Sequence, residues 1–125
     1  MNRTLIALSS LLLLISCAVS AGAQTKTTTV HGEFVEVTSY VKEGIKPSSV
    51  AGKEIAMANL GKGGALAMLE KGTNKLYFVG ADVKDSTYLP RLTAYLGSKI
   101  FIKGPVATRS GVRVITVVDI GKSLK

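Results

Sequence analysis

The sequence predicts a mainly β protein, a five-stranded OB-like Greek-key barrel with two short helices. One long segment rich in Val, Thr, Phe and Tyr spans residues 28–41, and Gly32 gives it a place to bend. Four more β-rich segments follow, at 65–70, 75–80, 98–104 and 112–120. A helical pattern separates the third segment from the fourth, which is the layout of an OB-fold barrel. An SH3-like barrel is the alternative.

Residues 1–23 have the pattern of a secretory signal peptide. Arg3 precedes an apolar run at 5–15, and Ala21-Gly22-Ala23 supplies small residues for cleavage. The run is shorter than the roughly 20 residues that a membrane-spanning helix requires. We therefore expect export to the periplasm or secretion, with no transmembrane helix after signal removal.

The residues before the cleavage site leave a second processing route open. Leu14-Ile15-Ser16-Cys17 resembles the lipobox of bacterial lipoproteins, in which the cysteine is lipidated. Cleavage after Ala23 would instead remove Cys17, the single cysteine of the chain, and start the mature protein at Gln24. We favour the soluble form, and a membrane-anchored lipoprotein is the alternative.

The rest of the chain has the length of one domain. Residues 24–29 are polar and are expected to be a flexible lead-in, and 30–121 the barrel domain. Loss of Arg3 takes the 16 Lys and Arg residues to 15 against 8 Asp and Glu, so the charge falls from +8 to about +7. The lysines are scattered without a basic run, which indicates solubility more than a nucleic-acid tract.

Turn and capping residues divide the segments. Within 30–41, the break in alternation between Phe34 and Val35 predicts a bulge or a change of face. Ser48 or Ser49 is the expected N-cap of a helix at 50–60. The glycines at 61–64 follow this helix, so they predict its end and not a phosphate-binding loop, which precedes a helix.

The second half of the chain is divided in the same way. Gly72 and Asn74 predict a hairpin between 65–70 and 75–80. Leucines at 89, 92 and 96, with Gly97 after them, predict a second helix at 88–96. The strand at 98–104 is expected to kink at Gly104-Pro105, and 112–120 is expected to be one strand.

The glycine and hydrophobic pattern resembles a group of small exported bacterial proteins with an OB-like barrel. That group has a V-x-G-x-V-x-x-x-x-C-Y strand, an H-x-x-C-A-x-x-C helix, a glycine loop and a terminal V-x-G…G-V-x-x-I-x-V region. The matching residues here lie in the first strand, the first helix, the glycine loop and the last two strands, namely Val30, Gly32, Phe34, Tyr40, Ala56, 61–64, Ile102, Gly104, Gly111, Val112, Val114 and Ile115.

This chain departs from the group at the residues that would carry chemistry. Ser39 stands where the pattern has a cysteine before the tyrosine, and Gly52, Ile55 and Asn59 stand at the histidine and cysteine positions of the helix. Thiolate and imidazole are the groups that bind soft metals or carry redox chemistry. The resemblance therefore implies a degenerate site that keeps the scaffold without metal or cofactor; a metal- or redox-related protein of the family type is the alternative.

The remaining residues do not suggest an enzyme. His31 is the single histidine, and a zinc site takes three or four protein ligands. Met57 and Met68 could join it around Cu(I), but both stand in apolar runs that indicate core packing. The glutamates are dispersed, without a paired-carboxylate pattern, so we expect no catalytic residues.

A binding or accessory role is the function that the sequence favours, with an unknown protein or small ligand as partner. OB-folds bind on the face of their second and third strands, where Lys75 and Tyr77 lie, with Tyr40 near the end of the first predicted strand. These three residues are the candidate ligand-binding surface, and the alternative places Phe78 in the core and Tyr77 on the barrel surface. Export argues against nucleic acid, although oligonucleotide or acidic-glycan binding is a further alternative.

Overall fold

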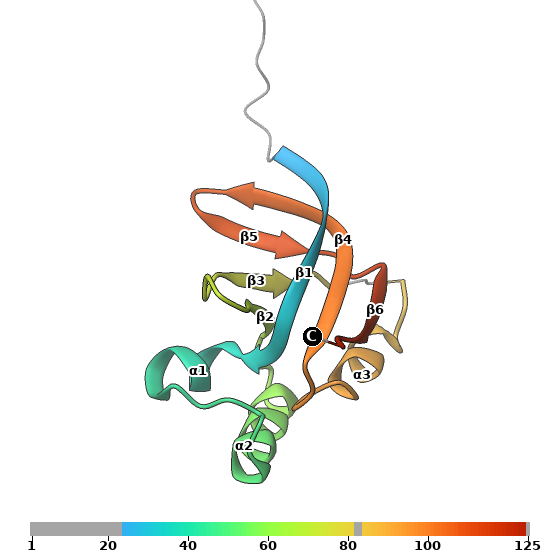
Figure 1. The fold of residues 1–125 in the computed structure, drawn as a ribbon. Coiled ribbons are helices and arrows are strands. Elements are labelled where there is room, and N and C mark those ends of the chain that lie inside the picture. The colour runs from blue at the N-terminus through green and yellow to red at the C-terminus, as the bar shows by residue number, and fades with distance from the viewer. Residues whose placement is uncertain (1–23, 82–83, 125) are drawn as a thin grey trace, which may run out of the picture.

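The computed structural model describes residues 24–81 and 84–124 and shows a closed five-stranded barrel with one extra strand (Figure 1). Its elements are β1 (Gln24–Glu36), α1 (Val37–Glu43), α2 (Val50–Gly61), β2 (Leu66–Glu70), β3 (Leu76–Val79), α3 (Tyr88–Thr93), β4 (Ile100–Arg109), β5 (Val112–Ile115) and β6 (Asp119–Lys122). The predicted signal peptide at 1–23, with Cys17, lies outside the described residues.

The strand order is that of an OB-like barrel, as predicted. The sheet runs β1-β2-β3-β5-β4-β6, and an added β1–β4 pairing closes the barrel. Neighbouring strands are antiparallel except β3 and β5, which are parallel. All three helices lie at the end of the barrel away from the β4–β5 turn (Figure 1).

β1 joins the two halves of the barrel, and Gly32 is the residue at which it does so. Gln24 to Gly32 pair with β4, whereas Gly32 to Glu36 pair with β2. A Cβ at Gly32 would lie 1.9 Å from the carbonyl oxygen of Leu69, so no other residue fits this close approach without a backbone shift. The predicted bend at Gly32 therefore coincides with the change of pairing partner.

The first strand differs from its predicted bounds at both ends. Residues 24–29, expected to be a flexible lead-in, form the first part of β1 and pair with β4. Residues 37–41, expected to continue the strand, belong to α1, so the fold has three helices and not two. The β-forming tendency of Val37, Thr38 and Val41 is overridden because the Glu36 side chain caps the helix start and Gly44, at φ 70°, ends it.

The predicted strand at 112–120 is two strands separated by an irregular segment. β5 pairs with the second part of β4 and β6 with the first part. Between them the chain passes so close to Gly104 that a Cβ there would lie 1.7 Å from the carbonyl oxygen of Thr116. The break lies opposite Gly104-Pro105, while β4 itself continues through this pair, in contrast to the expected kink.

The other elements agree with their predictions within a few residues. The helix at 50–60 is α2, capped by Ser49, whose Oγ accepts a hydrogen bond from the Gly52 N–H at 3.0 Å. The hairpin at 65–80 is β2 and β3. The helix at 88–96 ends earlier than predicted, at Thr93, and turns carry the chain on to Gly97 at φ +88°.

Two apolar clusters lie on opposite sides of the sheet. The interior cluster fills the barrel with residues from every barrel strand and from α3, among them Val30, Phe34, Met68, Tyr77, Leu92, Ile100, Ile102 and Ile115. The smaller outer cluster is covered by α1 and consists of Val35, Ala67 and Leu69, with Val37, Tyr40 and Leu76 packed against them. The pairing of β1 with β2 is continuous through Phe34 and Val35, so the expected bulge or break in alternation is absent. The two residues point to opposite faces by ordinary alternation, and both are apolar because each face carries a cluster.

Candidate functional site

The structure does not bring the three predicted ligand-binding residues onto one surface. Tyr40 is half-buried in the outer cluster, whereas Tyr77 is 8% exposed and belongs to the interior cluster. Lys75 is exposed just before β3. Tyr77 thus lies in the core and Phe78 is only partly buried, which reverses the alternative that placed Phe78 inside and Tyr77 outside.

The surroundings of Tyr77 are those of a packed core phenol. Burial, followed by the negative charge of Glu70, raises the pKa of the Tyr77 hydroxyl, while the positive charge of Arg113 acts in the opposite direction. The Arg113 guanidinium carbon lies 5.7 Å from the centre of the Tyr77 ring, at the distance of a cation–π contact. The ring is therefore held between the core and Arg113 and is not free to stack on a ligand.

Two of the four degenerate-site residues, Ser39 and Asn59, meet at the carboxylate of Glu36. Glu36 is fully buried. Its Oε1 accepts hydrogen bonds from the Ser39 N–H at 3.0 Å and from the Asn59 side-chain amide at 3.0 Å, and its Oε2 accepts one from the Thr38 N–H at 2.8 Å. The carboxylate therefore links the end of β1 to α1 and, through Asn59, to α2.

The electrostatics of this carboxylate favour its charged form. Burial by itself raises the pKa of the Glu36 carboxyl, but the hydrogen bonds from Thr38, Ser39 and Asn59 outweigh burial and lower that pKa below its ordinary value. Because both oxygens are engaged by the protein's own donors, the arrangement serves to hold elements together. Ser39 and Asn59 were identified from the sequence as degenerate-site positions, but no sequence signal linked them to Glu36.

The other two degenerate-site residues lie apart from Glu36. Gly52 is buried against the preceding loop, where a Cβ would lie 2.1 Å from the carbonyl oxygen of Lys46. Ile55 is 40% exposed on α2. Gly52 therefore lets α2 approach the loop closely, and Ile55 faces outward.

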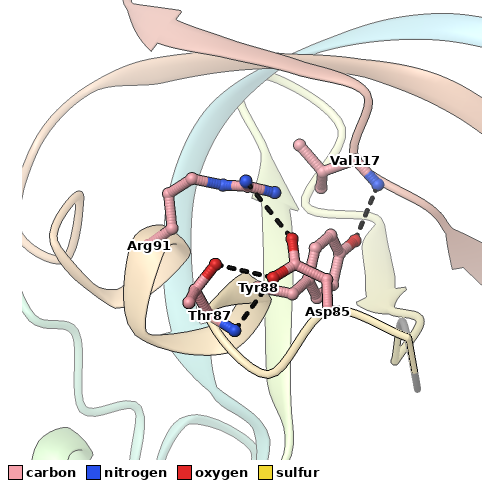
Figure 2. A network of polar contacts seen from close by, with 5 residues as sticks. All are labelled: Asp85, Thr87, Tyr88, Arg91 and Val117. Carbon is pink, nitrogen blue, oxygen red and sulfur yellow. Dashed lines mark hydrogen bonds and ion pairs between the residues drawn. The ribbon is translucent and has the colours of Figure 1, made fainter.

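A second polar network lies where α3 begins (Figure 2). Asp85 Oδ1 accepts hydrogen bonds from the Thr87 N–H at 2.9 Å and the Thr87 hydroxyl at 2.6 Å, and Arg91 Nη1 lies 3.4 Å from Asp85 Oδ2. The hydrogen bonds from Thr87, with a further contribution from Arg91, lower the pKa of the Asp85 carboxyl.

The tyrosine of the same helix connects α3 to the irregular segment between β5 and β6. The Tyr88 hydroxyl accepts a hydrogen bond from the Val117 N–H at 2.8 Å, and both residues are buried (Figure 2). The guanidinium carbon of Arg91 lies 5.7 Å from the centre of the Tyr88 ring. The hydrogen bond from Val117 attaches α3 to the barrel. The Asp85 carboxylate and the Arg91 guanidinium form an ion pair with each other.

An open groove lies on the outer face of the barrel, beside the bend in β1. We call it the β1-bend groove, with a volume of about 750 Å³. It is lined by residues of β1, the α1–α2 loop, the β2–β3 turn, the start of β4 and the C-terminal segment, namely His31, Gly32, Glu33, Lys46, Leu69, Glu70, Lys71, Gly72, Asn74, Lys99, Phe101, Lys122, Ser123 and Leu124.

The groove combines apolar side chains with an excess of positive charge. Four lysines and two glutamates line it. Lys46 Nζ lies 3.6 Å from Glu33 Oε1, and Glu70 accepts a hydrogen bond from the Thr73 hydroxyl. Among the described residues, the other three lysines have no ion pair, so the groove presents uncompensated positive charge.

The groove could not be predicted from local sequence patterns because its lysines come from four distant segments. One local signal could have indicated part of it. In Lys99-Ile100-Phe101-Ile102-Lys103 the isoleucines alternate with the lysines and the phenylalanine, so Phe101 shares the outer face with basic residues. Ile100 and Ile102 are fully buried, which leaves Phe101 on the groove side.

The described residues offer no assembled metal site. Within 24–81 and 84–124, no three His, Cys, Asp or Glu side chains are grouped so that they could hold a metal ion. His31 is exposed on the barrel surface, Met68 is fully buried in the interior cluster and Met57 lies 44% exposed on α2, so these three do not converge on copper. Each helix in the same residues falls short of the length and hydropathy of a membrane span.

Comparison of the chain with protein-family models, with curated proteins and with solved structures gives no match.

Proposed function

We propose that this protein is an exported, non-catalytic binding or accessory module that holds its ligand in the β1-bend groove. The groove is the observation that carries the proposal, because its volume of about 750 Å³ lies within the range of about 300–1,000 Å³ typical of small-molecule sites. The export pattern of residues 1–23 supports the cellular location.

The chemistry of the lining supports holding a ligand more than transforming one. Lysine, phenylalanine, leucine and glycine make up much of the surface, and the carboxylate of Glu33 is paired with Lys46. His31 Nδ1 has the Ser123 hydroxyl oxygen at 3.5 Å, a loose contact at the protein surface. Lysine side chains can hold a ligand by electrostatic attraction, and apolar side chains can hold it by burial of apolar surface; neither interaction requires a reacting group.

A titration with four small aromatic probes of different charge tests the proposal. The probes are phenyl phosphate, benzoate, benzyl alcohol and benzylammonium, each added to ¹⁵N-labelled protein of residues 24–125. We expect saturable chemical-shift changes at groove amides such as Gly32, Gly72 and Phe101 with at least one probe. Phosphorus NMR of the phenyl phosphate sample is expected to show no hydrolysis.

Two results would contradict the proposal. If none of the four probes produces saturable shifts at the groove amides, the groove is not the binding site. If the protein hydrolyses phenyl phosphate and a substitution such as Lys99→Gln abolishes that hydrolysis, the module is catalytic.

A further inference from the structure

We propose, building on the binding function above, that the β1-bend groove is selective for a small organic acid in which a ring bears a phosphate or carboxylate. The ring would lie on the apolar part of the groove beside Phe101, and the acid would face the lysines. This site differs from the one predicted from the sequence, because none of Tyr40, Lys75 and Tyr77 lines the groove.

The apolar part of the groove is built around the ring of Phe101. Phe101 is opposite Gly121 in the β4–β6 ladder, and a Cβ at Gly121 would lie 2.7 Å from the Phe101 ring. The absence of a side chain at Gly121 therefore lets this ring lie against the backbone of β6.

The neighbouring side chains extend this apolar surface. The His31 ring centre lies 6.1 Å from that of Phe101, with the two planes at 47°. Leu69, 3% exposed, belongs to the outer cluster and also lines the groove. Aromatic rings pair favourably in tilted arrangements with centroids about 4.5–7 Å apart, so a ligand ring has an aromatic surface to join.

The positive charge arrives from separate elements that surround this surface. Lys71 follows β2, Lys99 precedes β4, Lys122 ends β6, and Lys46 comes from the α1–α2 loop. Backbone hydrogen bonds hold two of these segments in place. The Lys71 N–H donates to the His31 carbonyl at 2.8 Å, and the Ser123 N–H, next to Lys122, donates to the Lys99 carbonyl at 2.9 Å.

The charge balance selects the sign of the ligand. Lys46 is paired with Glu33, whereas Lys71, Lys99 and Lys122 have no ion pair within the described chain. Glu70 offsets one of these three charges, so four lysines against two glutamates leave the groove a net charge of about +2. A cation or a neutral molecule would leave these charges uncompensated, and an anion would pair with them. Since the lysines are exposed, the attraction is screened by salt, with a Debye length of about 10 Å at 0.1 M ionic strength.

The four-probe titration, extended by acetate and inorganic phosphate, tests this ligand class. We expect phenyl phosphate to bind most tightly, benzoate next, and benzyl alcohol and benzylammonium more weakly. Acetate and inorganic phosphate should bind more weakly than benzoate and phenyl phosphate, because they lack the ring. The difference between phenyl phosphate and benzoate assigns the acid to a phosphate or to a carboxylate.

Substitutions separate the contributions of charge and ring. We expect Lys71→Gln, Lys99→Gln and Lys122→Gln each to weaken phenyl phosphate binding roughly two- to fivefold, and the triple variant to weaken it further. Lys26→Gln, which removes the same charge from the far part of β1, should leave binding unchanged. Phe101→Leu should weaken benzoate but not inorganic phosphate, whereas Phe78→Leu, an aromatic on β3 outside the groove, should change neither.

The outcomes distinguish this inference from the function on which it rests. If benzyl alcohol or benzylammonium shifts the groove amides with an affinity equal to that of the acids, the selectivity is wrong while the binding function stands. If the three lysine substitutions change phenyl phosphate binding no more than Lys26→Gln does, the selectivity is likewise wrong. Loss of groove shifts with all probes would contradict the binding function itself.

Discussion

The carboxylate of Glu36 connects β1, α1 and α2 through three hydrogen bonds made in a buried place. A hydrogen bond to a charged group of this kind contributes more to folding stability than one between neutral groups. Removal of the carboxylate leaves buried donors without an acceptor. Ser, Thr, Asp and Asn are the usual N-cap residues, so a glutamate in this role is not anticipated from helix-cap preferences.

We predict that Glu36→Gln lowers the free energy of unfolding by about 1–3 kcal/mol, because the amide cannot accept all three hydrogen bonds. Urea denaturation followed by circular dichroism measures the change. Glu43→Gln, the same substitution at an exposed site on α1, is the matched control and should change stability by less than about 0.5 kcal/mol. Equal effects of the two substitutions would show that the buried carboxylate does not hold these elements.

The lowered pKa of the Glu36 carboxyl also predicts a pH dependence. A carboxyl whose folded pKa lies below its unfolded pKa contributes stability that is complete above the unfolded value and is lost as the pH falls through the folded value. The difference in stability between wild type and Glu36→Gln should therefore stay constant from about pH 7 to about pH 5 and shrink as the pH falls from about 5 to about 3. Urea midpoints across this range measure it, and a difference that stays constant below about pH 5 would contradict the prediction.

At Gly32 the closeness of two strands determines which residue fits. We predict that Gly32→Ala destabilises the protein by about 3 kcal/mol, because the new Cβ would meet the carbonyl oxygen of Leu69 in the backbone of β2. Gly61→Ala is the control, since a Cβ there meets nothing within 4 Å and alanine favours the helix by up to about 1 kcal/mol. Thermal unfolding of both variants measures the contrast, and a neutral Gly32→Ala would show that the β1–β2 ladder can shift.

Among the elements, α1 shows how a β-forming sequence becomes a helix. Val37 and Tyr40 pack on the outer cluster with Val35 and Leu69, and this packing on one helical face is available only once β1 and β2 have paired. The caps at Glu36 and Gly44 then satisfy the helix ends. Local propensity alone favoured a strand, and tertiary packing decided for the helix.

α3 packs on the barrel core through Tyr88 and Leu92, and the Tyr88 hydroxyl accepts a hydrogen bond from the Val117 N–H. We predict that Tyr88→Phe costs about 1–3 kcal/mol, because the buried N–H of Val117 would lose this acceptor. Amide hydrogen exchange at Val117 should become faster in this variant. The control is Tyr95→Phe, at a half-buried tyrosine packed against the same core. Unchanged exchange at Val117 in the Tyr88→Phe variant would contradict the role assigned to the Tyr88 hydroxyl.

For the whole molecule, closure of the barrel depends on the full length of β1. Residues 24–29 extend the pairing with β4 beyond the part that the sequence assigned to the barrel. A mature protein that begins at Gln24 would keep all of this strand.

We predict that mass spectrometry of the exported protein gives a chain that starts at Gln24, because the small residues 21–23 follow the apolar run at the position of a cleavage site. Expression of a Cys17→Ser variant is the control, and its export and mature mass should be unchanged. A mature protein that starts at Cys17 and carries the mass of a lipid would contradict this prediction and support the anchored form.

Much of the architecture could be predicted from the sequence because it depends on local patterns. β-branched runs, the turn glycines and the Ser49 cap identified the hairpin, α2 and the barrel. The bend at Gly32 could be predicted for the same reason.

Only the tertiary structure decided which residues meet. Tyr77 turned inward because the parity of the β2–β3 ladder sets its face, and Tyr40 became part of a helix that covers the outer cluster. Ser39 and Asn59 meet at Glu36, although Asn59 is 23 positions further along the chain than Glu36. The lysines of the β1-bend groove come together because β1, β2, β4 and β6 converge beside Gly32, and that convergence depends on long-range pairing, which no local pattern encodes.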